Sequence, residues 1–283
     1  MKVEKIRLKN LASLEGEWEL DLTGPAYSRN GIFAITGATG AGKTTTISLL
    51  STLLLPTEGE ILIDGQTLGR NRPDLKRKIS VITQEYSMRQ DMNMDEIMEY
   101  QGRLYFMPRK EIKRKTEELL DFCGLLPFRK RTVRKLSGGM KRKLMVCRAL
   151  LTSPEILLLD EPTAGMDALS RRQMWNLLRQ LNGKNLTILL TTHYMEEAQS
   201  LCNRVALMDH GKLEEINTPS GLIDGLGKYT VDQETPEGAK SHYFHSREEA
   251  ISFLSSLDGQ CTLRETTLED VFVERAGRHL MQR

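Results

Sequence analysis

The chain has 283 residues, of which 39% are hydrophobic and 28% charged, and its formal net charge is only +2. This composition is ordinary for a globular protein, and the length suffices for one large domain or two small ones. The four cysteines, Cys123, Cys147, Cys202 and Cys261, are widely spaced, which argues against a zinc site or a disulfide framework and favours reduced thiols. No apolar run reaches the length of a membrane span and the N-terminus is not a signal peptide, so work at a membrane would require another chain to cross it.

Apolar patterns predict strands and helices that alternate along the chain. Alternating residues indicate an N-terminal antiparallel hairpin, and short continuous runs indicate buried strands. The predicted elements are, in order, strands at 2–11, 17–22 and 32–36, a helix at 45–54, strands at 59–68 and 78–85, helices from about 88 to 126, a strand at 155–160, a helix at 168–181, a strand at 186–193, a helix at 195–202 and a hairpin at 204–216. This alternation predicts an α/β sheet with helices on both faces. The tail is a less regular α+β segment that ends in a helix at 267–280, capped by Thr266 or Thr267.

Basic residues are concentrated in one part of the helical region. Residues 101–148 contain 15 Lys and Arg against 4 Asp and Glu, a net +11, so the remaining residues carry −9. This block is either a solvated helical face or a surface for anionic lipid headgroups, a partner protein or nucleic acid. The sequence leaves these alternatives open.

A glycine-rich loop between a buried strand and a helix predicts a nucleotide site. Its residues fit G-x-x-x-x-G-K-[ST] in the structural context that this motif requires. The loop amides and the helix N-terminus form an anion site, Lys43 is expected to reach the β- and γ-phosphates, and the Thr44 hydroxyl to ligate Mg²⁺. Thr45 adds a possible phosphate contact. The predicted ATP-binding residues are Gly37, Ala38, Thr39, Gly40, Ala41, Gly42, Lys43, Thr44 and Thr45.

Two adjacent carboxylates follow the apolar strand ILLLD. Asp160 ends this strand, at the edge where open α/β sheets bind ligands, and suits the Mg²⁺ site directly or through water. Glu161 is well placed to accept a proton from an attacking water. Acidic residues at a strand end are common, so this pair gains its meaning from the motifs around it.

The whole set of motifs resembles the nucleotide-binding domains of the ATP-binding cassette (ABC) family. In order, the chain contains the phosphate loop, Gln84, the segment LSGGMKRK, DEPTAGMD and TTH ending at His193. The resemblance implies an α/β P-loop NTPase fold with an N-terminal antiparallel β subdomain and a helical subdomain at about 88–150. It implies an ABC ATPase domain at residues 1–216 and a small α+β C-terminal extension at residues 217–283.

The resemblance also implies roles for individual residues and a pair of ATP sites shared between two subunits. Gln84 corresponds to the lid glutamine, which senses Mg²⁺ and the attacking water and contacts the transmembrane partner. Ser137, Gly138 and Gly139 correspond to the signature motif, which contacts the γ-phosphate bound by the opposite subunit, and a helix N-terminus suits that task. Asp167 corresponds to an aspartate at the subunit contact, and His193 to the histidine that hydrogen-bonds the γ-phosphate. The second subunit is either an identical chain or a paralogue.

The two ends of the chain resemble different members of this family. From Thr45 onward, segments such as LLLPTEGEILIDG, TTHYMEEAQSLCNRVALMDHGKL and TLEDVFVERAG are similar to ATPase subunits of ABC-2 or multidrug exporters. The first 45 residues, with RLKNL and Thr39, are similar to SMC-like ATPases of DNA-break repair. The chain is therefore either a hybrid of two ABC-type ATPases or a transporter ATPase with an unusual start. Transporter ATPases of this family usually have an aromatic residue before the second N-terminal strand, where it stacks on adenine, and the corresponding segment here, NLASLEG, has none. Trp18 is the nearest candidate, although core packing explains it better. Residues 25–31 are the other candidate for the adenine contact.

The exporter interpretation is favoured over two alternatives. It implies an ATPase on the cytoplasmic face of the cell membrane, with ATP and Mg²⁺ as cofactors and a transmembrane permease as partner. A repair ATPase is expected to contain a long heptad coiled coil, and residues 43–137 contain no heptads, although the basic block keeps DNA in consideration. A module that uses ATP only as a structural ligand would not need both Glu161 and His193. His242 and His245 have no acidic or cysteine partner at metal-ligand spacing, so they indicate a surface connection from a strand to a helix rather than a metal site.

Overall fold

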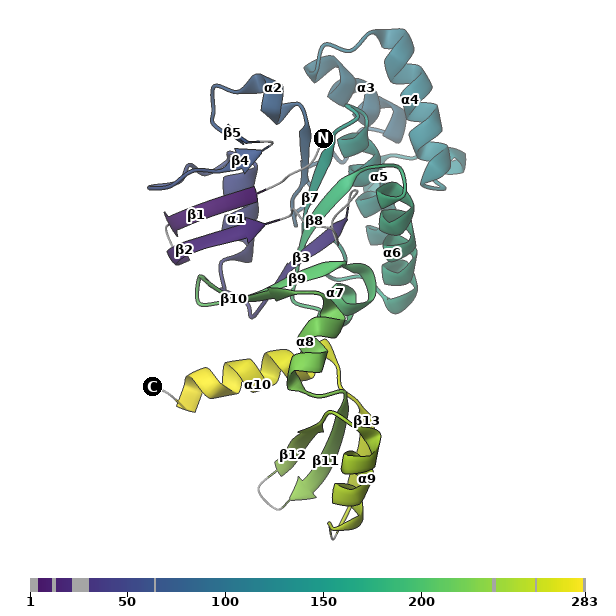
Figure 1. The fold of residues 1–283 in the computed structure, drawn as a ribbon. Coiled ribbons are helices and arrows are strands. Elements are labelled where there is room, and N and C mark those ends of the chain that lie inside the picture. The colour runs from purple at the N-terminus through teal and green to yellow at the C-terminus, as the bar shows by residue number, and fades with distance from the viewer. Residues whose placement is uncertain are drawn as a thin grey trace.

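The structure is a computed structural model that describes residues 5–11, 14–21, 31–63, 65–235, 238–257 and 259–281, with only the backbone described for residues 5–11, 14–21 and 276–281 (Figure 1). Its centre is a six-stranded sheet in the order β10-β9-β3-β8-β7-β6. The strands are β3 (Ile32–Thr36), β6 (Ile79–Ile82), β7 (Ile156–Asp160), β8 (Thr187–Thr192), β9 (Arg204–Asp209) and β10 (Lys212–Asn217). All neighbours run parallel except β10, which pairs antiparallel with β9.

Both faces of this sheet are buried, because successive side chains of a strand point to opposite sides. In β3, Ile32 and Ala34 belong to one hydrophobic cluster, and Phe33 and Ile35 to another. The first cluster includes residues of α5 (Gly138–Leu150), α6 (Ala168–Asn182) and α7 (Met195–Leu201). The second includes residues of α1 (Lys43–Leu50), so α1 and α5 cover opposite faces (Figure 1).

The predicted N-terminal hairpin is confirmed by two antiparallel strands. Strand β1 (Lys5–Leu11) pairs with β2 (Leu14–Asp21), with Leu8 opposite Trp18. A second, shorter hairpin joins β4 (Leu62–Ile63) and β5 (Gln66–Thr67), and α2 (Pro73–Lys76) follows it. The segment 25–31 that was considered for adenine lies, except for Gly31, outside the described residues, and nothing described about Trp18 decides its role.

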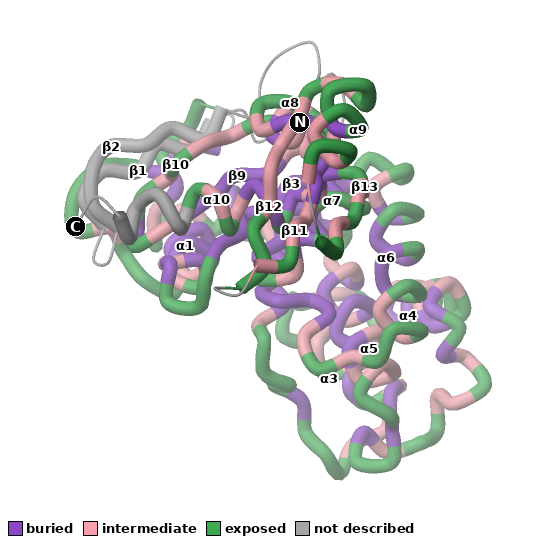
Figure 2. Tube along the Cα trace, turned by 90° about the horizontal axis from the view of Figure 1, so that it is seen from below, coloured by how far each residue is buried: buried purple, intermediate pink, exposed green. Residues whose placement is uncertain are grey.

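Helices α3 (Met94–Leu104) and α4 (Arg109–Phe122) form, with the first turns of α5, a lobe to one side of the sheet (Figure 2). Helix α3 begins with a capping box, since the Asn93 side chain accepts from the Glu96 amide and the Glu96 carboxylate accepts from the Asn93 amide. The two helices approach closely, because a Cβ on Gly102 would lie 2.5 Å from a side-chain carbon of Ile112. Two short 3₁₀ turns, Leu126–Phe128 and Val133–Lys135, lead into α5.

The C-terminal tail forms a small α+β unit at one end of the molecule (Figure 1). Its three-stranded antiparallel sheet has the order β12-β11-β13, and its elements are α8 (Pro219–Leu226), β11 (Tyr229–Thr235), β12 (Gly238–Phe244), α9 (Arg247–Ser255), β13 (Cys261–Glu265) and α10 (Leu268–Met281). The predicted cap is confirmed for Thr267, whose hydroxyl accepts from the Asp270 amide at 3.4 Å. Arg264 ties the unit together through ion pairs with Asp232 and Asp270.

The structure differs from the sequence prediction at the end of α1. The apolar run predicted a helix to residue 54, but α1 ends at Leu50. Thr52 has φ 60, in the left-handed region, and Leu53 to Leu55 are exposed. These leucines extended the apparent helical pattern although they do not pack into the core. Among the described residues, no helix has the length and apolar character needed to cross a membrane.

Candidate functional site

The carboxyl ends of four neighbouring parallel strands meet at one edge of the sheet. In spatial order, β3 leads into the phosphate loop, β8 into His193, β7 into Asp160 and Glu161, and β6 into Gln84. Parallel strands place their carboxyl ends on the same side of the sheet. The segments that follow these strands therefore converge there, although they are distant in the chain. The edge is therefore the candidate active site.

The phosphate loop requires glycine for two different reasons, which are the lack of space for a side chain and a left-handed backbone conformation. A Cβ on Gly37 would lie 2.0 Å from the carbonyl oxygen of Met208 in β9, so only glycine fits there. Gly40 and Gly42 have φ angles of 85° and 102°, which L side chains rarely adopt. The loop is held to the β9–β10 turn by the Gly211 amide, which donates to the Ala41 carbonyl at 3.0 Å.

The loop presents donors to its open side. Helix α1 begins at Lys43 without a side-chain cap, which leaves its first amide groups available to an anion. Ala38, Thr39 and Gly40 are exposed. The Lys43 ammonium donates to the Gly37 and Ala38 carbonyls at 2.7 and 2.8 Å, and burial lowers its pKa, an effect that the Glu161 and Asp160 carboxylates oppose.

Asp160 is held between two hydroxyl groups. One of its carboxylate oxygens, Oδ1, accepts from Thr191 at 2.6 Å and from Thr44 at 3.2 Å. Thr191 lies directly opposite Asp160 in the β7–β8 register. The sequence analysis missed Thr191, although its place at the end of a buried strand beside the Asp160 strand was a usable signal. The carboxylate is thus fixed next to the Thr44 hydroxyl.

Glu161 and His193 form a hydrogen-bonded pair. The His193 Nδ1 atom lies 2.7 Å from Glu161 Oε2, and the Glu161 side chain is largely buried whereas the His193 side chain is partly exposed. Glu161 has φ 49, a left-handed conformation that is rare for a residue with a side chain. Its amide donates to the Thr191 carbonyl at 3.1 Å, which holds this conformation. Such strained positions are concentrated at functional sites.

Gln84 and Thr45 lie at the same edge without side-chain partners among the hydrogen bonds of the described residues. Gln84 is exposed beyond the end of β6, and its backbone carbonyl accepts from Arg142 at 3.3 Å. Thr45 is half-buried in the first turn of α1. The structure places both near the loop and the carboxylates, and it describes no contact that fixes their roles.

The signature residues lie apart from the phosphate loop. They begin α5, which covers the face of the sheet opposite to α1, and Ser137 caps α5 by accepting from the Met140 amide at 3.3 Å. A Cβ on Gly138 or Gly139 would meet its nearest neighbours only at 3.5 and 3.4 Å. The fold of this chain therefore does not require glycine at either position, and two glycines weaken the start of a helix. Ser137 and Gly138 are exposed, and Gly139 is half-buried.

Asp167 has a structural task of its own. Its carboxylate accepts from the Ser170 amide at 2.8 Å and from the Ser170 hydroxyl at 2.7 Å, so it is the N-cap of α6. The hydrogen bonds from Ser170 lower the pKa of this exposed carboxyl. The capping contacts account for an aspartate here, and a subunit contact remains a prediction.

Arg142 is a central residue that the sequence analysis counted only as part of the basic block. Its buried guanidinium donates at 2.7–3.3 Å to five backbone carbonyls, those of Thr83, Gln84, Asp160, Glu161 and Pro162. Burial lowers the pKa of Arg142. One side chain of α5 thus joins the segment after β6 to the segment after β7. Its sequence signal was weak, because Arg142 stands among three other cations.

We expect Arg142→Met to destabilise the fold strongly. The variant leaves five carbonyls without their donor, which costs at least about 3 kcal/mol and lowers Tm by about 6–12 °C. Denaturation in urea and by heat measures both quantities. The matched control is Lys143→Met, a half-buried neighbour whose single side-chain hydrogen bond, to Gln173, is exposed, and it is expected to change stability by less than about 0.5 kcal/mol. Equal stability of Arg142→Met and wild type contradicts the assignment.

Glu197 is a second residue that the sequence analysis did not identify. This fully buried side chain in α7 accepts from the Thr163 hydroxyl and the Trp175 indole, both at 2.9 Å. It connects the helix after His193 to the loop after Glu161 and to α6. Burial raises the pKa of Glu197, although these hydrogen bonds oppose the shift.

The raised pKa of Glu197 predicts a pH-dependent stability. A carboxyl whose pKa is higher in the folded state stabilises the fold fully below its ordinary pKa, and this contribution is lost as pH rises through the folded value. We expect the free energy of unfolding to fall more between about pH 5 and about pH 8 in wild type than in Glu197→Gln, which keeps an acceptor for both donors. Urea denaturation at several pH values measures the difference. Parallel pH profiles for the two proteins would contradict the prediction.

Comparisons with known proteins agree with this geometry. A family model described as ABC transporter matches residues 26–164. The linearmycin resistance ATP-binding protein LnrL of Bacillus subtilis is 36% identical over 206 residues, which are 73% of this chain and 66% of that protein. The Nod factor export ATP-binding protein I of Cupriavidus pinatubonensis is 34% identical over 273 residues, and the alignment covers 89% of this chain and 84% of that protein. The daunorubicin/doxorubicin resistance protein DrrA of Streptomyces peucetius is 35% identical over 237 residues, 84% of this chain and 69% of that protein.

Solved structures have the same fold. The cbiO1 protein of Clostridium perfringens, part of the ABC transporter complex cbiONQ, aligns with a TM-score of 0.68 and 23% identity over 78% of this chain and 88% of its own. An ATP-binding subunit of an ABC transporter aligns with a TM-score of 0.64 and 25% identity over 77% and 91%. The predicted fold class is confirmed, and the transporter interpretation is confirmed over the repair interpretation, for which the comparisons give no support. The chain therefore belongs to the ABC transporter family and is one of its ATP-binding, ATP-hydrolysing subunits.

Proposed function

We propose that the chain is the motor subunit of an exporter, which binds Mg-ATP at the carboxyl edge of its sheet and closes head to tail on a second ATP-binding subunit. The observation that supports this most is the Glu161–His193 pair, placed beside Lys43 and Asp160 at the edge where the phosphate loop opens. An ATP-dependent clamp needs both a phosphate site and a group that responds to the terminal phosphate. Residues 1–216 form the ATPase domain of this proposal, and residues 217–283 an extension.

The donor set fits a magnesium ion. The Thr44 hydroxyl and an Asp160 carboxylate oxygen are 3.2 Å apart, and hard oxygen ligands of this kind are those that Mg²⁺ binds together with water and phosphate. Thr44 and Asp160 would hold the ion, with Gln84 approaching from the end of β6. An ion held there would supply positive charge against the bound phosphates. Residues 37–45 would hold the phosphates themselves through backbone amides and Lys43.

Glu161 is the proposed general base for the attacking water. Its carboxylate stands one residue beyond Asp160 and is oriented by His193, so it is held close to the place of the terminal phosphate. His193 is partly exposed and hydrogen-bonds the same carboxylate, which allows it to exchange that contact for a phosphate oxygen. The pair thereby responds to the presence of the γ-phosphate.

The second half of each ATP site comes from another chain in this proposal. The open N-terminus of α5, with Ser137, Gly138 and Gly139, lies on the face of the sheet opposite to α1. It is an anion site that the phosphate loop of its own chain does not use. A symmetric pair of chains joins each such terminus to the partner's phosphate loop, and Asp167 lies beside Gly139 through Ser170.

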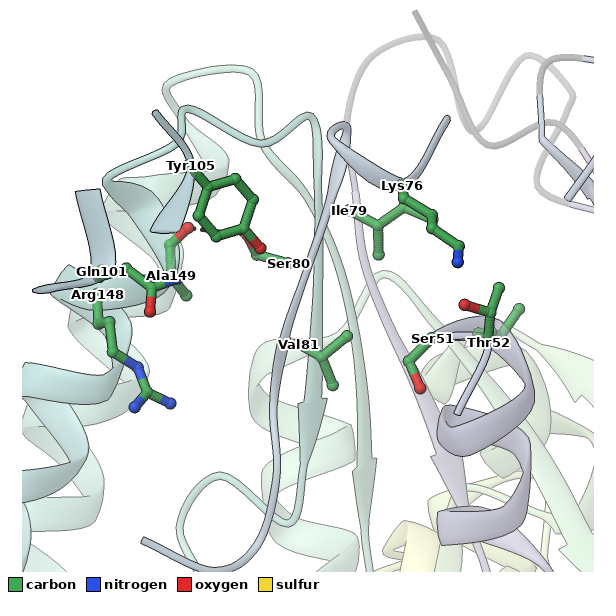
Figure 3. A pocket seen from close by; sticks show the side chains of 11 residues that line it. Ser51, Thr52, Lys76, Ile79, Ser80, Val81, Gln101, Tyr105, Arg148 and Ala149 are labelled. Carbon is green, nitrogen blue, oxygen red and sulfur yellow. Dashed lines mark hydrogen bonds between the residues drawn. The ribbon is translucent and has the colours of Figure 1, made fainter. Parts of the chain in front are cut away.

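A groove of about 340 Å³ along β6 is the proposed docking place for a membrane-spanning partner (Figure 3). Ser51, Thr52 and Lys76 line one side, and Gln101, Tyr105, Arg148 and Ala149 the other. Arg148 also donates to the Ser87 carbonyl at 2.7 Å, which connects the groove to the segment after Gln84. The exposed Leu53, Leu54 and Leu55 follow Thr52 in the chain. A short helix of a permease, approaching from the membrane at the inner face of the cell, fits such a groove.

The test is a tagged purification from detergent-solubilised membranes of the source cell, with Glu161→Gln and ATP present to hold the closed state. Co-elution of a polytopic membrane protein supports the exporter. Loss of this protein when the Glu161→Gln chain also carries Tyr105→Glu supports the groove as its docking place. Recovery of a nuclease or duplex DNA without a membrane protein contradicts the proposal. A partner that remains bound after Tyr105→Glu places its contact elsewhere than the groove.

A further inference from the structure

The turn between α3 and α4 exposes a large aromatic side chain. Phe106 is 90% exposed, and the preceding Leu104 and Tyr105 are 54% and 44% exposed. Tyr105 lines the groove along β6, whereas Phe106 is not among its lining residues. An isolated exposed apolar residue needs no explanation, but three in succession at the turn between two helices form a surface that water solvates poorly.

The backbone at this turn also disfavours phenylalanine. Helix α3 ends in a Schellman motif, in which the Phe106 amide donates to the Arg103 carbonyl and the Met107 amide to the Gly102 carbonyl, both at 3.0 Å. The residue at the Phe106 position of this motif is left-handed and is usually glycine. Phe106 has φ 56, so it is strained as well as exposed. Neither packing nor local conformation therefore accounts for an aromatic residue here.

Cationic side chains surround this turn. Residues 99–114 contain five Lys and Arg against two Asp and Glu, a net +3. Glu99 pairs with Arg103 and Arg109, whereas the exposed Lys110 and Lys113 form no ion pair among the described residues. Both lie in the first two turns of α4, which begins three residues after Phe106. Aromatic side chains flanked by basic ones are typical of surfaces that bind the headgroup region of an anionic bilayer.

We propose that the α3–α4 turn is a membrane anchor, in which Phe106 enters the interfacial region of an anionic lipid bilayer while Lys110 and Lys113 contact its headgroups. A protein partner is the less suitable occupant, because no ion pair among the described residues holds the exposed Lys110 and Lys113 in a fixed position. This anchor is a separate proposal from the docking groove, because it would give the chain an affinity for lipid even without a protein partner. It also accounts for part of the basic block as a lipid-binding surface.

The test uses the purified chain and vesicles of phosphatidylcholine with and without phosphatidylglycerol. We expect binding to the anionic vesicles that weakens with added salt, because headgroup contacts are screened. Phe106→Gly is expected to reduce the partition coefficient about tenfold, since it removes the buried aromatic group. The same variant relieves the left-handed strain and is expected to raise Tm by about 2–4 °C, so weaker binding cannot result from unfolding.

Three further variants make the result specific. Phe106→Trp is expected to retain binding, and its tryptophan fluorescence is expected to shift to the blue with anionic vesicles only. Wild type serves as the reference for this shift, because it already contains Trp18 and Trp175. Lys110→Glu with Lys113→Glu is expected to weaken binding to anionic vesicles alone. Val273→Ser, at an exposed apolar residue in α10, is the control and should bind as wild type does. The proposal is overturned if the chain does not bind vesicles, or if wild type and Phe106→Gly bind them equally. It is also overturned if Phe106→Gly loses a membrane protein partner while its binding to vesicles is unchanged.

Discussion

Replacing Glu161 by Gln is expected to lower kcat for ATP hydrolysis by about a thousandfold. The amide keeps the size of the side chain but cannot accept the proton of the attacking water. The phosphate loop and Asp160 are untouched, so ATP affinity should remain within about threefold of wild type, and the closed dimer should accumulate with ATP. Steady-state hydrolysis, nucleotide titration and gel filtration with ATP measure the three effects.

The matched control for this variant is Glu196→Gln. Glu196 is exposed in the first turn of α7, three residues after His193, and it has no hydrogen bond or ion pair among the described contacts. Its replacement should leave kcat unchanged. A loss of less than about tenfold in Glu161→Gln would assign the base to another group, because general-base catalysis contributes at least about a hundredfold.

Two inactive chains are expected to restore activity to each other when they form a mixed dimer. Lys43→Ala removes the phosphate contact of one chain, and Ser137→Arg blocks the helix N-terminus of the other with a bulky cation. In the mixed dimer, one site combines the intact Lys43 of one chain with the intact Ser137 of the other. If the two sites act independently, this dimer should reach about half of the wild-type rate. Coexpression with two different tags, followed by purification on both, isolates it for measurement.

The control for this experiment places both substitutions in one chain and pairs it with Lys43→Ala. No site of that dimer is intact, so it should stay as inactive as either variant alone. Activity of the first mixed dimer at the same low level would contradict the shared site. Full activity of Ser137→Arg by itself would mean that the N-terminus of α5 does not meet nucleotide.

Much of the candidate site could be predicted because its parts are contiguous in sequence. The conformation of residues 37–44 depends on local glycines, as the φ angles of Gly40 and Gly42 demonstrate, and its donors are backbone amides. Asp160 ends one buried strand and His193 follows another, and parallel pairing then brings the strand ends together without further information. The α/β fold followed from the same apolar patterns.

Other features depended on neighbours that are distant in the chain. Arg142 bonds to carbonyls 18 to 59 residues away, and no local pattern distinguishes it from Lys141 or Lys143, which are only half-buried. Glu197 likewise receives its hydrogen bonds from residues 22 and 34 positions away. The solvation of a charged side chain depends on all the segments packed around it, and sequence position alone does not report them.

The sequence by itself therefore determined the phosphate loop, the carboxylates at the strand end and the family, because local backbone geometry and residue type suffice for these. Only the tertiary structure decided which charges are buried, where α1 ends, and that Phe106 stands exposed in a left-handed turn. These depend on packing between distant segments, and an apolar residue looks the same in sequence whether it lies in the core or on the surface.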